Sequence, residues 1–421
     1  MTTTRRTYVC RIQNHSQVAG ALDRHGWSAS KLWNVANYYA RQQWDETGEI
    51  PDENELKHEL KTHPKYKGLH SQSSQKVLEE LSEAFSSWFG SDDDRDNPPG
   101  YRKTNYYDSH GNRVHEEHPR STVTWKQKGI RHDTKHNRLR LSKGKNHKDG
   151  RDFILCEYQA SPEVELTNIQ QVRAVWCNYK QRWELHVVCE TEITAESPGE
   201  KTAGVDLGIC NPAAVAFPDD ALLYPGNTLR EDKHYFQREE YQTEGPHGPS
   251  QKSQWAREKL SRRKDHFLHA LSKDIVERCV DHGVGTLVVG DPSGVDEDDW
   301  GRHGNKRLDN WAYKRLMNLI DYKARERGIE VEMPDERGTS SSCSVCGHED
   351  GESRVKRGLW NCDRCGVVAH GDVNGADNIR QKTLPVTPPL GQGDSGNGCL
   401  AQPRVVQFSR TRGFQPRTPA E

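Results

Sequence analysis

The sequence predicts a multidomain protein, in which a β-rich region with helices precedes an α/β domain that carries a four-cysteine metal module. Three observations predict it. Short alternating apolar runs fill residues 98–198, strands alternate with helical patterns from residue 201, and four of the eleven cysteines fall between residues 343 and 365. The chain has 421 residues, of which 32% are apolar, so it can bury several cores and still expose a large polar surface.

The N-terminal half divides into three predicted parts. Residues 1–14 contain one short strand, 15–97 are helical, and 98–198 form an antiparallel sheet or barrel with runs such as "FILCEY" and "WELHVVCE". Apolar residues recur at helical spacing in the second part: Val18, Leu22, Leu32, Val35, Tyr39, and later Val77, Leu78, Leu81, Phe85 and Trp88.

The C-terminal half predicts a parallel or mixed α/β sheet. The strands "AGVDLGI", "AAVAF", "TLVVG" and "IEVEMP" alternate with a long basic helix at about 251–282 and with the helical pattern "NWAYKRLMNLIDYKARERG". We assign 199–340 and 367–384 to this domain and 341–366 to the cysteine module. Residues 385–421 lack periodicity and are predicted to be a disordered tail.

The total charge gives no nucleic-acid signal, since 60 Lys and Arg oppose 62 Asp and Glu, but cations cluster locally. Residues 120–149 hold ten Lys or Arg and two acids, which favours a phosphate-binding surface over a solvated edge of the β-rich region. The first half of the long helix is also basic, and we expect it to meet a nucleic-acid duplex. The predicted contacts are Lys126, Lys128, Arg131, Lys135, Arg138, Arg140, Arg262, Arg263 and Lys264.

No 18-residue apolar stretch and no apolar leader occur in the sequence, so we expect a cytoplasmic protein without a membrane partner.

The cysteine spacing is the most specific motif. Cys343 and Cys346 precede Cys362 and Cys365 in the pattern C-x2-C-x15-C-x2-C, which is typical of a tetrahedral zinc site. Four thiolates close the coordination shell, so this zinc is expected to be structural.

Several acids follow predicted strands or begin a predicted helix. Asp206 ends "AGVDLGI", Asp291 follows "TLVVG", Glu336 follows "IEVEMP", and Asp372 stands in "HGDVNGADNIRQ". Carboxylates that meet at one sheet edge suit two Mg²⁺ ions that act on a phosphodiester.

These motifs, with "RRKDHFLHALSKDIV", "GTSSSCSVCG" and "WNCDRCG", resemble in order and spacing the TnpB (OrfB) proteins of insertion sequences, which are related to type V CRISPR effectors. The likeness is specific over about residues 200–380. It implies a RuvC-like, RNase H-type nuclease with an inserted zinc ribbon, preceded by a β-barrel-like wedge domain with a helical recognition insertion. It also implies a guide RNA from the transposon end and a double-stranded DNA target.

The sequence departs from the family where the second strand normally ends in a catalytic Glu, because Gly290 stands there. Side-chain alternation turns Asp291 to the opposite face unless the strand bulges. In the RNase H-type topology that the resemblance implies, the strand before Glu336 lies next to the strand that ends at Gly290. Some members of the family use an acid further downstream, and we therefore predict Asp206, Glu336 and Asp372 as the magnesium ligands, with Asp291 in reserve. Besides an RNA-guided DNA endonuclease, a cleavage-deficient guided repressor and a strand-joining transposase remain open.

Overall fold

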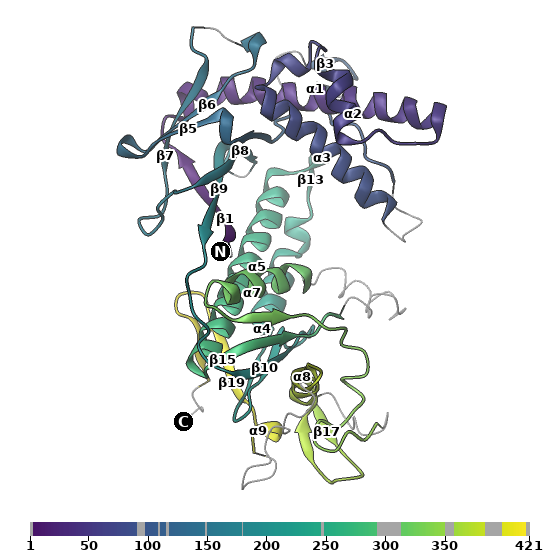
Figure 1. Cartoon of the computed structure of the whole chain (residues 1–421), viewed down its shortest axis with the longest axis vertical. Coiled ribbons are helices and arrows are strands. Elements are labelled where there is room, and N and C mark those ends of the chain that lie inside the picture. The colour runs from purple at the N-terminus through teal and green to yellow at the C-terminus, as the bar shows by residue number, and fades with distance from the viewer. Residues whose placement is uncertain are drawn as a thin grey trace. The chain divides into compact units, whose positions relative to one another are not determined.

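The computed structural model describes residues 3–90, 97–107, 110–114, 118–147, 150–178, 180–245, 248–292, 313–349, 358–383 and 398–417 (Figure 1). The chain forms two compact units. One comprises Arg5–Thr191, and the other comprises Met1–Thr4 and Glu192–Glu421.

The N-terminal unit contains a seven-stranded sheet in the order β4-β8-β9-β1-β7-β6-β5. Its strands are β1 (Thr3–Ile12), β4 (Val123–Lys126), β5 (Ile130–Asp133), β6 (Arg138–Ser142), β7 (Phe153–Gln159), β8 (Ile169–Cys177) and β9 (Arg182–Glu192). The pairings of β1 with β7, β4 with β8, β5 with β6, β6 with β7 and β8 with β9 are antiparallel, as the alternating runs predicted. A closed barrel stays a prediction. A small hairpin pairs β2 (Tyr106–Tyr107) with β3 (Arg113–Val114).

Three helices belong to the same unit: α1 (His15–Thr47), α2 (Glu53–Leu60) and α3 (Ser71–Phe89). Asp52 and Glu55 form a capping box that fixes the start of α2. Leu32 of α1, Leu78 of α3 and Trp125 of β4 are fully buried in one core, so the helical and β-rich regions form one unit rather than two. The described residues also form short 3₁₀ turns. Four lie in this unit, η1 (Tyr66–Gly68), η2 (Gln127–Gly129), η3 (Thr134–His136) and η4 (Lys145–His147), and η5 (Glu239–Tyr241) lies in the other.

The C-terminal unit is built on a second seven-stranded sheet, in the order β16-β15-β10-β11-β12-β19-β20. Its strands are β10 (Lys201–Asp206), β11 (Ala213–Ala216), β12 (Ala221–Tyr224), β15 (Val284–Val289), β16 (Glu330–Glu332), β19 (Arg404–Ser409) and β20 (Gly413–Pro416). β10 pairs in parallel with β15 and antiparallel with β11, and β15 pairs in parallel with β16, which confirms a mixed sheet.

The last two strands correct the prediction of a disordered tail. β19 pairs in parallel with β12, and Val406 and Phe414 are buried in the core of the sheet. The alternation in "RVVQF" was too short to outweigh the Pro- and Gly-rich run before it. Within the predicted tail, residues 385–397 and 418–421 lie outside the described residues.

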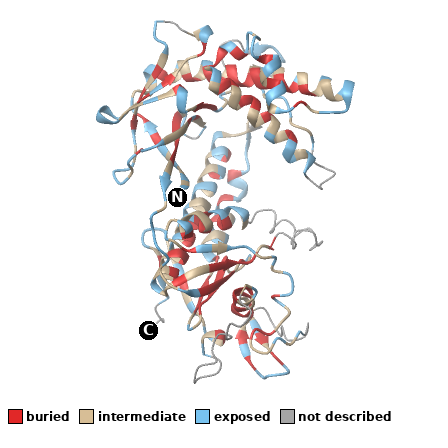
Figure 2. Cartoon of the chain, viewed as in Figure 1, coloured by how far each residue is buried: buried red, intermediate tan, exposed pale blue. Residues whose placement is uncertain are grey.

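Helices cover both faces of this sheet (Figure 1). α5 (Gln251–Asp281) and α7 (Tyr313–Arg325) pack on one face, and α8 (Gly371–Gln381) packs on the other; α4 (Asn227–Phe236) and α9 (Gly398–Ala401) are shorter. Figure 2 shows buried residues, in red, on the central strands of the sheet and on the helices that pack against it. Two hairpins, β13 (Glu244–Gly245) with β14 (Gly248–Pro249) and β17 (Leu359–Asn361) with β18 (Val368–His370), lie outside the sheet. In the described part of the chain, no helix is both long and apolar enough to cross a bilayer.

Side chains alternate along β10. Ala203 and Val205 enter the core shared with α5 and α7. Gly204 faces α8, and a Cβ atom there would lie 2.1 Å from the carbonyl oxygen of Ala376 and 2.6 Å from the amide nitrogen of Arg380. The backbones of β10 and α8 therefore touch, which only glycine permits.

We expect Gly204→Ala to lower the stability of this unit by about 1–3 kcal/mol, because the added methyl group would meet helix backbone that cannot rotate away. Calorimetric melting of the full chain measures the change. Gly398→Ala is the matched control, since a Cβ atom there has no neighbour within 4 Å among the described residues. Equal melting temperatures for both variants would contradict the packing described.

Candidate nuclease site and zinc ribbon

Asp206 and Asp372 lie on the same face of the sheet. Asp206 ends β10 two residues after Gly204, so both face the same side of the sheet. A Cβ atom on Gly375 would lie only 2.7 Å from Oδ2 of Asp206. Asp372 stands in the first turn of α8, where a negative charge is favourable. The side-chain amide of Asn211 donates a hydrogen bond of 2.7 Å to its Oδ2 atom, so the position of this carboxylate is fixed from the sheet side.

Glu336 lies beside the predicted gap at Gly290. Leu287 and Val289 of β15 enter the core with α5 and α7, whereas Gly290 faces α8. A Cβ atom on Gly290 would lie 3.1 Å from Oε2 of Glu336 and 3.3 Å from its Cβ atom. The side chain of Glu336 thus occupies the space that a side chain at position 290 would enter.

The parallel pairing of β15 with β16 brings Glu336 there. Beyond both strands, the amide of Asp291 donates to the carbonyl of Pro334 at 2.9 Å, and the amide of Glu336 donates to the carbonyl of Asp291 at 3.4 Å. The expectation that the two strands are neighbours is confirmed.

The surroundings of Glu336 favour a cation. Burial, together with the negative charges of Asp291 and Asp335, raises its pKa to about 7, although Lys382 acts in the opposite direction. Its Oε2 atom is buried and has no hydrogen-bond partner in the part of the chain that the structure describes. A buried carboxylate oxygen without a donor is costly, and a hard cation such as Mg²⁺ would satisfy it.

The three predicted acids do not form one tight cluster. Within the described residues, the only group of three or more His, Cys, Asp or Glu whose donor atoms all lie within 4.8 Å of one another is the cysteine group. The magnesium site therefore stays a prediction, and so does the reserve role of Asp291. Asp377, the second acid of α8, has a structural role instead, since it is fully buried and forms a 2.8 Å ion pair with Arg380.

The four cysteines converge as their spacing predicted. Sγ of Cys343 lies 3.7 Å from Sγ of Cys365, and Sγ of Cys346 lies 3.6 Å from Sγ of Cys362. Zn–S bonds of ~2.3 Å in a tetrahedron place sulfurs ~3.8 Å apart, so the group fits zinc. Burial opposes ionisation of Cys362, but backbone N–H groups of Cys365 and Arg364 lower its pKa to about 7. The ribbon hairpin extends to His370, beyond the predicted end at residue 366.

The ribbon is attached to α8 by the two asparagines of "HGDVNGADNIRQ". Asn374 accepts from the amide of Ser344 at 2.9 Å and donates to the carbonyl of Ser342 at 2.8 Å. Asn378 donates to the carbonyls of Ser342 and Thr339 at 2.7 and 2.8 Å. The segment that leads into the first cysteine pair is therefore bonded to the helix that carries Asp372.

Some of the predicted phosphate-binding cations of the N-terminal unit contact other side chains of the protein, and others are exposed. Lys126 contacts Glu79, Arg138 pairs with Glu157 at 2.8 Å, and the guanidinium of Arg140 lies 5.2 Å from the centre of the Phe153 ring. Lys128, Arg131 and Lys135 are exposed. Trp125, from the same segment, lies in the core, where its indole N–H donates to the carbonyl of Ser142 at 2.8 Å.

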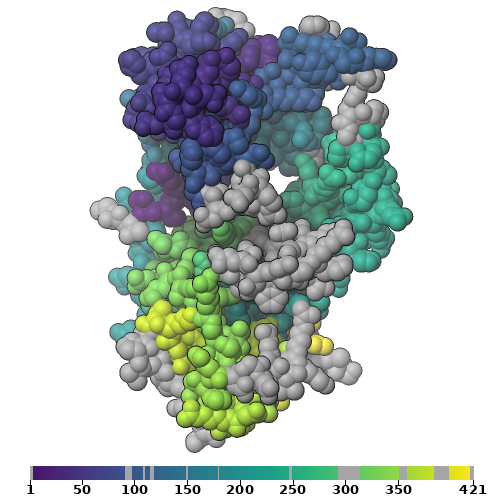
Figure 3. Space-filling view, turned by 90° about the vertical axis from the view of Figure 1, so that its right-hand side faces the viewer, coloured from purple at the N-terminus to yellow at the C-terminus, as the bar shows by residue number. Residues whose placement is uncertain are grey.

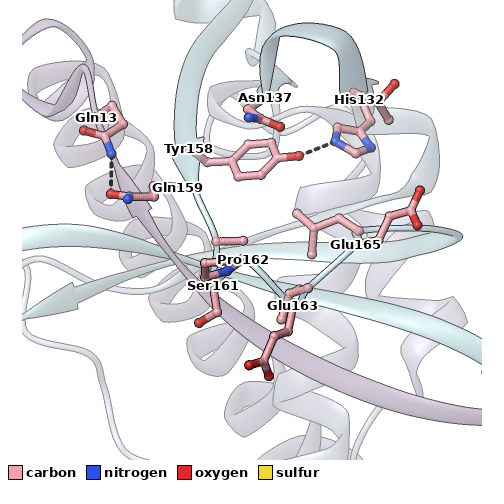
Figure 4. Close-up of a pocket in the computed structure, with 13 residues that line it drawn as sticks. Gln13, His132, Asn137, Tyr158, Gln159, Ser161, Pro162, Glu163 and Glu165 are labelled. Atoms are coloured by element: carbon pink, nitrogen blue, oxygen red, sulfur yellow. Dashed lines mark hydrogen bonds between the residues drawn. The ribbon is translucent and has the colours of Figure 1, made fainter.

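Figure 4 shows a cavity of about 750 Å³ in the same unit. The hydroxyl of Tyr158 lies 2.7 Å from Nε2 of His132, and Gln13 donates to Gln159 at 2.6 Å. Burial lowers the pKa of His132 and raises that of Tyr158, so both are neutral near pH 7. None of the predicted acids or cysteines lines this cavity.

The basic helix α5 is less free than its sequence suggests. Its first half packs through Ala256 on Phe236 of α4, a helix that the sequence did not predict, and on Tyr241 of η5. Arg263 contacts the buried Asp232, and burial lowers the pKa of Lys264, whereas Arg262 is exposed. Part of this half is therefore covered, and contact of its exposed cations, such as Arg262, with a duplex stays a prediction.

Known families match both parts of the C-terminal unit. A family described as a probable transposase, OrfB of IS605, matches residues 186–296, and the Cas12f1-like TNB domain matches residues 313–379.

Relatives and a solved structure agree with these matches. The TnpB-like protein ORF457 of Acidianus two-tailed virus is 26% identical, over 91% of this chain and 87% of its own length. The endodeoxyribonuclease Cas12f1 of Sulfoacidibacillus thermotolerans is 28% identical, but the match spans 48% of this chain and half of the relative. The fold resembles that of a Cas12f1–sgRNA–target DNA complex, with a TM-score of 0.55, 13% identity and coverage of 87% and 83% of the two chains.

The chain is therefore similar both to probable transposases of the OrfB type and to Cas12f1 proteins. Over most of its length the chain resembles a TnpB-like protein.

We expect freshly purified protein to contain about one zinc per chain, and Cys362→Ser to lose most of it, because four thiolates supply much of the folding free energy of a small ribbon. Elemental analysis measures the content. Cys399→Ser is the control, because this half-buried cysteine lies outside the four-cysteine group, and the variant should keep its zinc. A zinc content far below one per chain in the unmutated protein would contradict the assignment.

Proposed function

We propose that the chain is a transposon-associated, RNA-guided DNA endonuclease, and that Asp206, Glu336 and Asp372 hold two Mg²⁺ ions at its active site. The observation that carries this proposal is the position of Glu336, whose carboxylate lies beside the position 290 where the family's acid is missing. A carboxylate oxygen that is buried without a hydrogen-bond partner among the described residues has no evident structural role, whereas binding a metal ion would give it one.

The relatives support the guided part of this proposal. The Sulfoacidibacillus relative is a CRISPR-associated endodeoxyribonuclease, and the structure with a similar fold is a complex with sgRNA and target DNA. We infer that this chain likewise binds a guide RNA, from the transposon end, and a double-stranded DNA target chosen by base pairing. The sheet order, with β10 central between β15 and β11, supports a RuvC-type, RNase H-like domain.

Each acid would be held by a different part of the fold. The Asn211 amide orients Asp372, the missing side chain of Gly375 leaves space for Asp206, and the absence of a side chain at Gly290 leaves space for Glu336. When bound, two magnesium ions stabilise the attacking and leaving oxygens of a phosphodiester. Glu336 must be ionised to bind a magnesium ion. A bound cation would favour the ionised carboxylate and so lower its raised pKa.

The direct test begins with protein co-purified with its RNA. That RNA is sequenced, a matching duplex is prepared with varied flanking bases, and cleavage is followed with and without Mg²⁺. Guided binding without cleavage by the unmutated protein would favour a repressor, and joined rather than hydrolysed ends would favour a transposase.

Asp206→Ala and Asp372→Ala should each abolish cleavage and leave guided DNA binding intact, because binding depends on base pairing and on cations elsewhere. Cleavage and binding of the same duplex are measured side by side. Cleavage by either variant at close to the unmutated rate would remove that residue from the site.

Glu336→Gln should reduce the cleavage rate at least ~100-fold, since a preorganised charge at the reacting centre is lost. Asp291→Asn should cost much less, because strand alternation turns it away. Asp335→Asn is the matched control, an exposed acid next to Glu336 in the chain. A larger loss for Asp291→Asn than for Glu336→Gln would transfer the role to Asp291.

A further inference from the structure

A second cavity lies in the C-terminal unit, and none of the residues of the proposed cleavage site lines it. It measures about 730 Å³ and lies between α4, the first half of α5, and the β19–β20 hairpin that supplies Arg410. The teal segment that contains α4 and the start of α5 stands at the molecular surface in Figure 3. The volume is in the range of small-ligand pockets.

One part of the cavity wall is aromatic. Phe236 packs with Tyr241 and Ala256 in a small core of their own, separate from the core of the sheet. The ring of Trp255 meets Phe236 edge-on at 5.8 Å, and the neighbouring Tyr235 ring remains 40% exposed. These rings are held by contacts with each other, so Tyr235 is partly exposed in a fixed position.

The rest of the wall is cationic. Arg230, Arg238, Lys259, Arg263 and Arg410 line the cavity, against the acids Glu231 and Asp232. Five cations against two acids leave an excess of positive charge, which predicts an anionic ligand.

Asp232 gives this wall a fixed geometry. It is 4% exposed, contacts Arg263 of α5 and accepts from Arg410 at 2.6 Å. One buried carboxylate thus orients two guanidinium groups from segments far apart in the sequence. Arg238 adds a third, with its guanidinium 4.6 Å from the centre of the Tyr235 ring.

We propose that this cavity binds one unpaired nucleotide of a single-stranded nucleic acid, with the base against Tyr235 and the phosphate among the arginines. Aromatic rings combined with arginines are the usual means of binding single strands, whereas the bases of a duplex are already stacked on each other. A bare phosphate would leave the rings unused. The inference rests on the proposed function, which supplies both an RNA and displaced DNA as possible sources.

Photo-crosslinking tests the proposal on the full chain. Single-stranded RNA and DNA oligonucleotides of about ten residues, each with 5-iodouracil, are irradiated with the protein, and adducts are located by mass spectrometry. We expect adducts on Tyr235 or Trp255, and the oligonucleotide that forms them identifies the source. Adducts only at other residues would overturn the proposal. In protein that still cleaves its guided target, that result would leave the proposed function intact.

Affinity measurements provide the second readout. Tyr235→Leu and Arg238→Gln should each weaken binding of the crosslinking oligonucleotide about tenfold. Arg257→Gln is the matched control, because it removes an exposed cation from α5 outside the cavity and should change binding less than about twofold. An equal loss of affinity in all three variants would show a general charge effect and would also overturn the proposal. It would likewise be overturned if an acidic peptide competed with the oligonucleotide and no nucleotide adducts formed.

Discussion

The close approach of α8 to β10 is the constraint on which the rest of the C-terminal unit depends. Gly204 lets the helix backbone touch the strand, and Gly375, one turn after Asp372, lets the carboxylate of Asp206 lie against the helix. Asp206 and Asp372 can share one face of the sheet only because neither glycine has a side chain. The buried pair of Asp377 and Arg380 belongs to the same helix and satisfies its inner charges, so the two acids of "HGDVNGADNIRQ" have separate uses.

The same constraint explains how an acid can be replaced between strands. Ile379 of α8 lies 2.6 Å from where a Cβ atom of Gly290 would be, so helix, strand end and Glu336 converge on one point. Parallel pairing of β15 and β16 brings Glu336 to that point from the neighbouring strand, and its long side chain covers the offset. The zinc ribbon adds a further support, since Asn374 and Asn378 bond it to α8.

The sequence predicted what depends on local pattern or spacing. It predicted the cysteine group, the mixed sheet, the long helix at 251–282 and the adjacency of the strands before Asp291 and Glu336, and the structure confirms these. It did not predict α4, whose charged sequence "NTLREDKHYF" hides its apolar side, nor the pairing of β19 with β12, which joins segments about 180 residues apart. Lys126, Arg138 and Arg263 looked available for phosphates because their partners Glu79, Glu157 and Asp232 are distant in sequence or on another strand.

The most direct test of the central claim moves the acid back across the two strands. Cleavage of a guided duplex is compared for Glu336→Ala and for the double variant Glu336→Ala/Gly290→Glu, in which the Cβ atom added at position 290 meets the flexible end of Ile379. If Glu336 serves in place of the missing acid, the single variant loses cleavage and the double variant recovers a large part of it. Cleavage by Glu336→Ala at the unmutated rate would contradict the account.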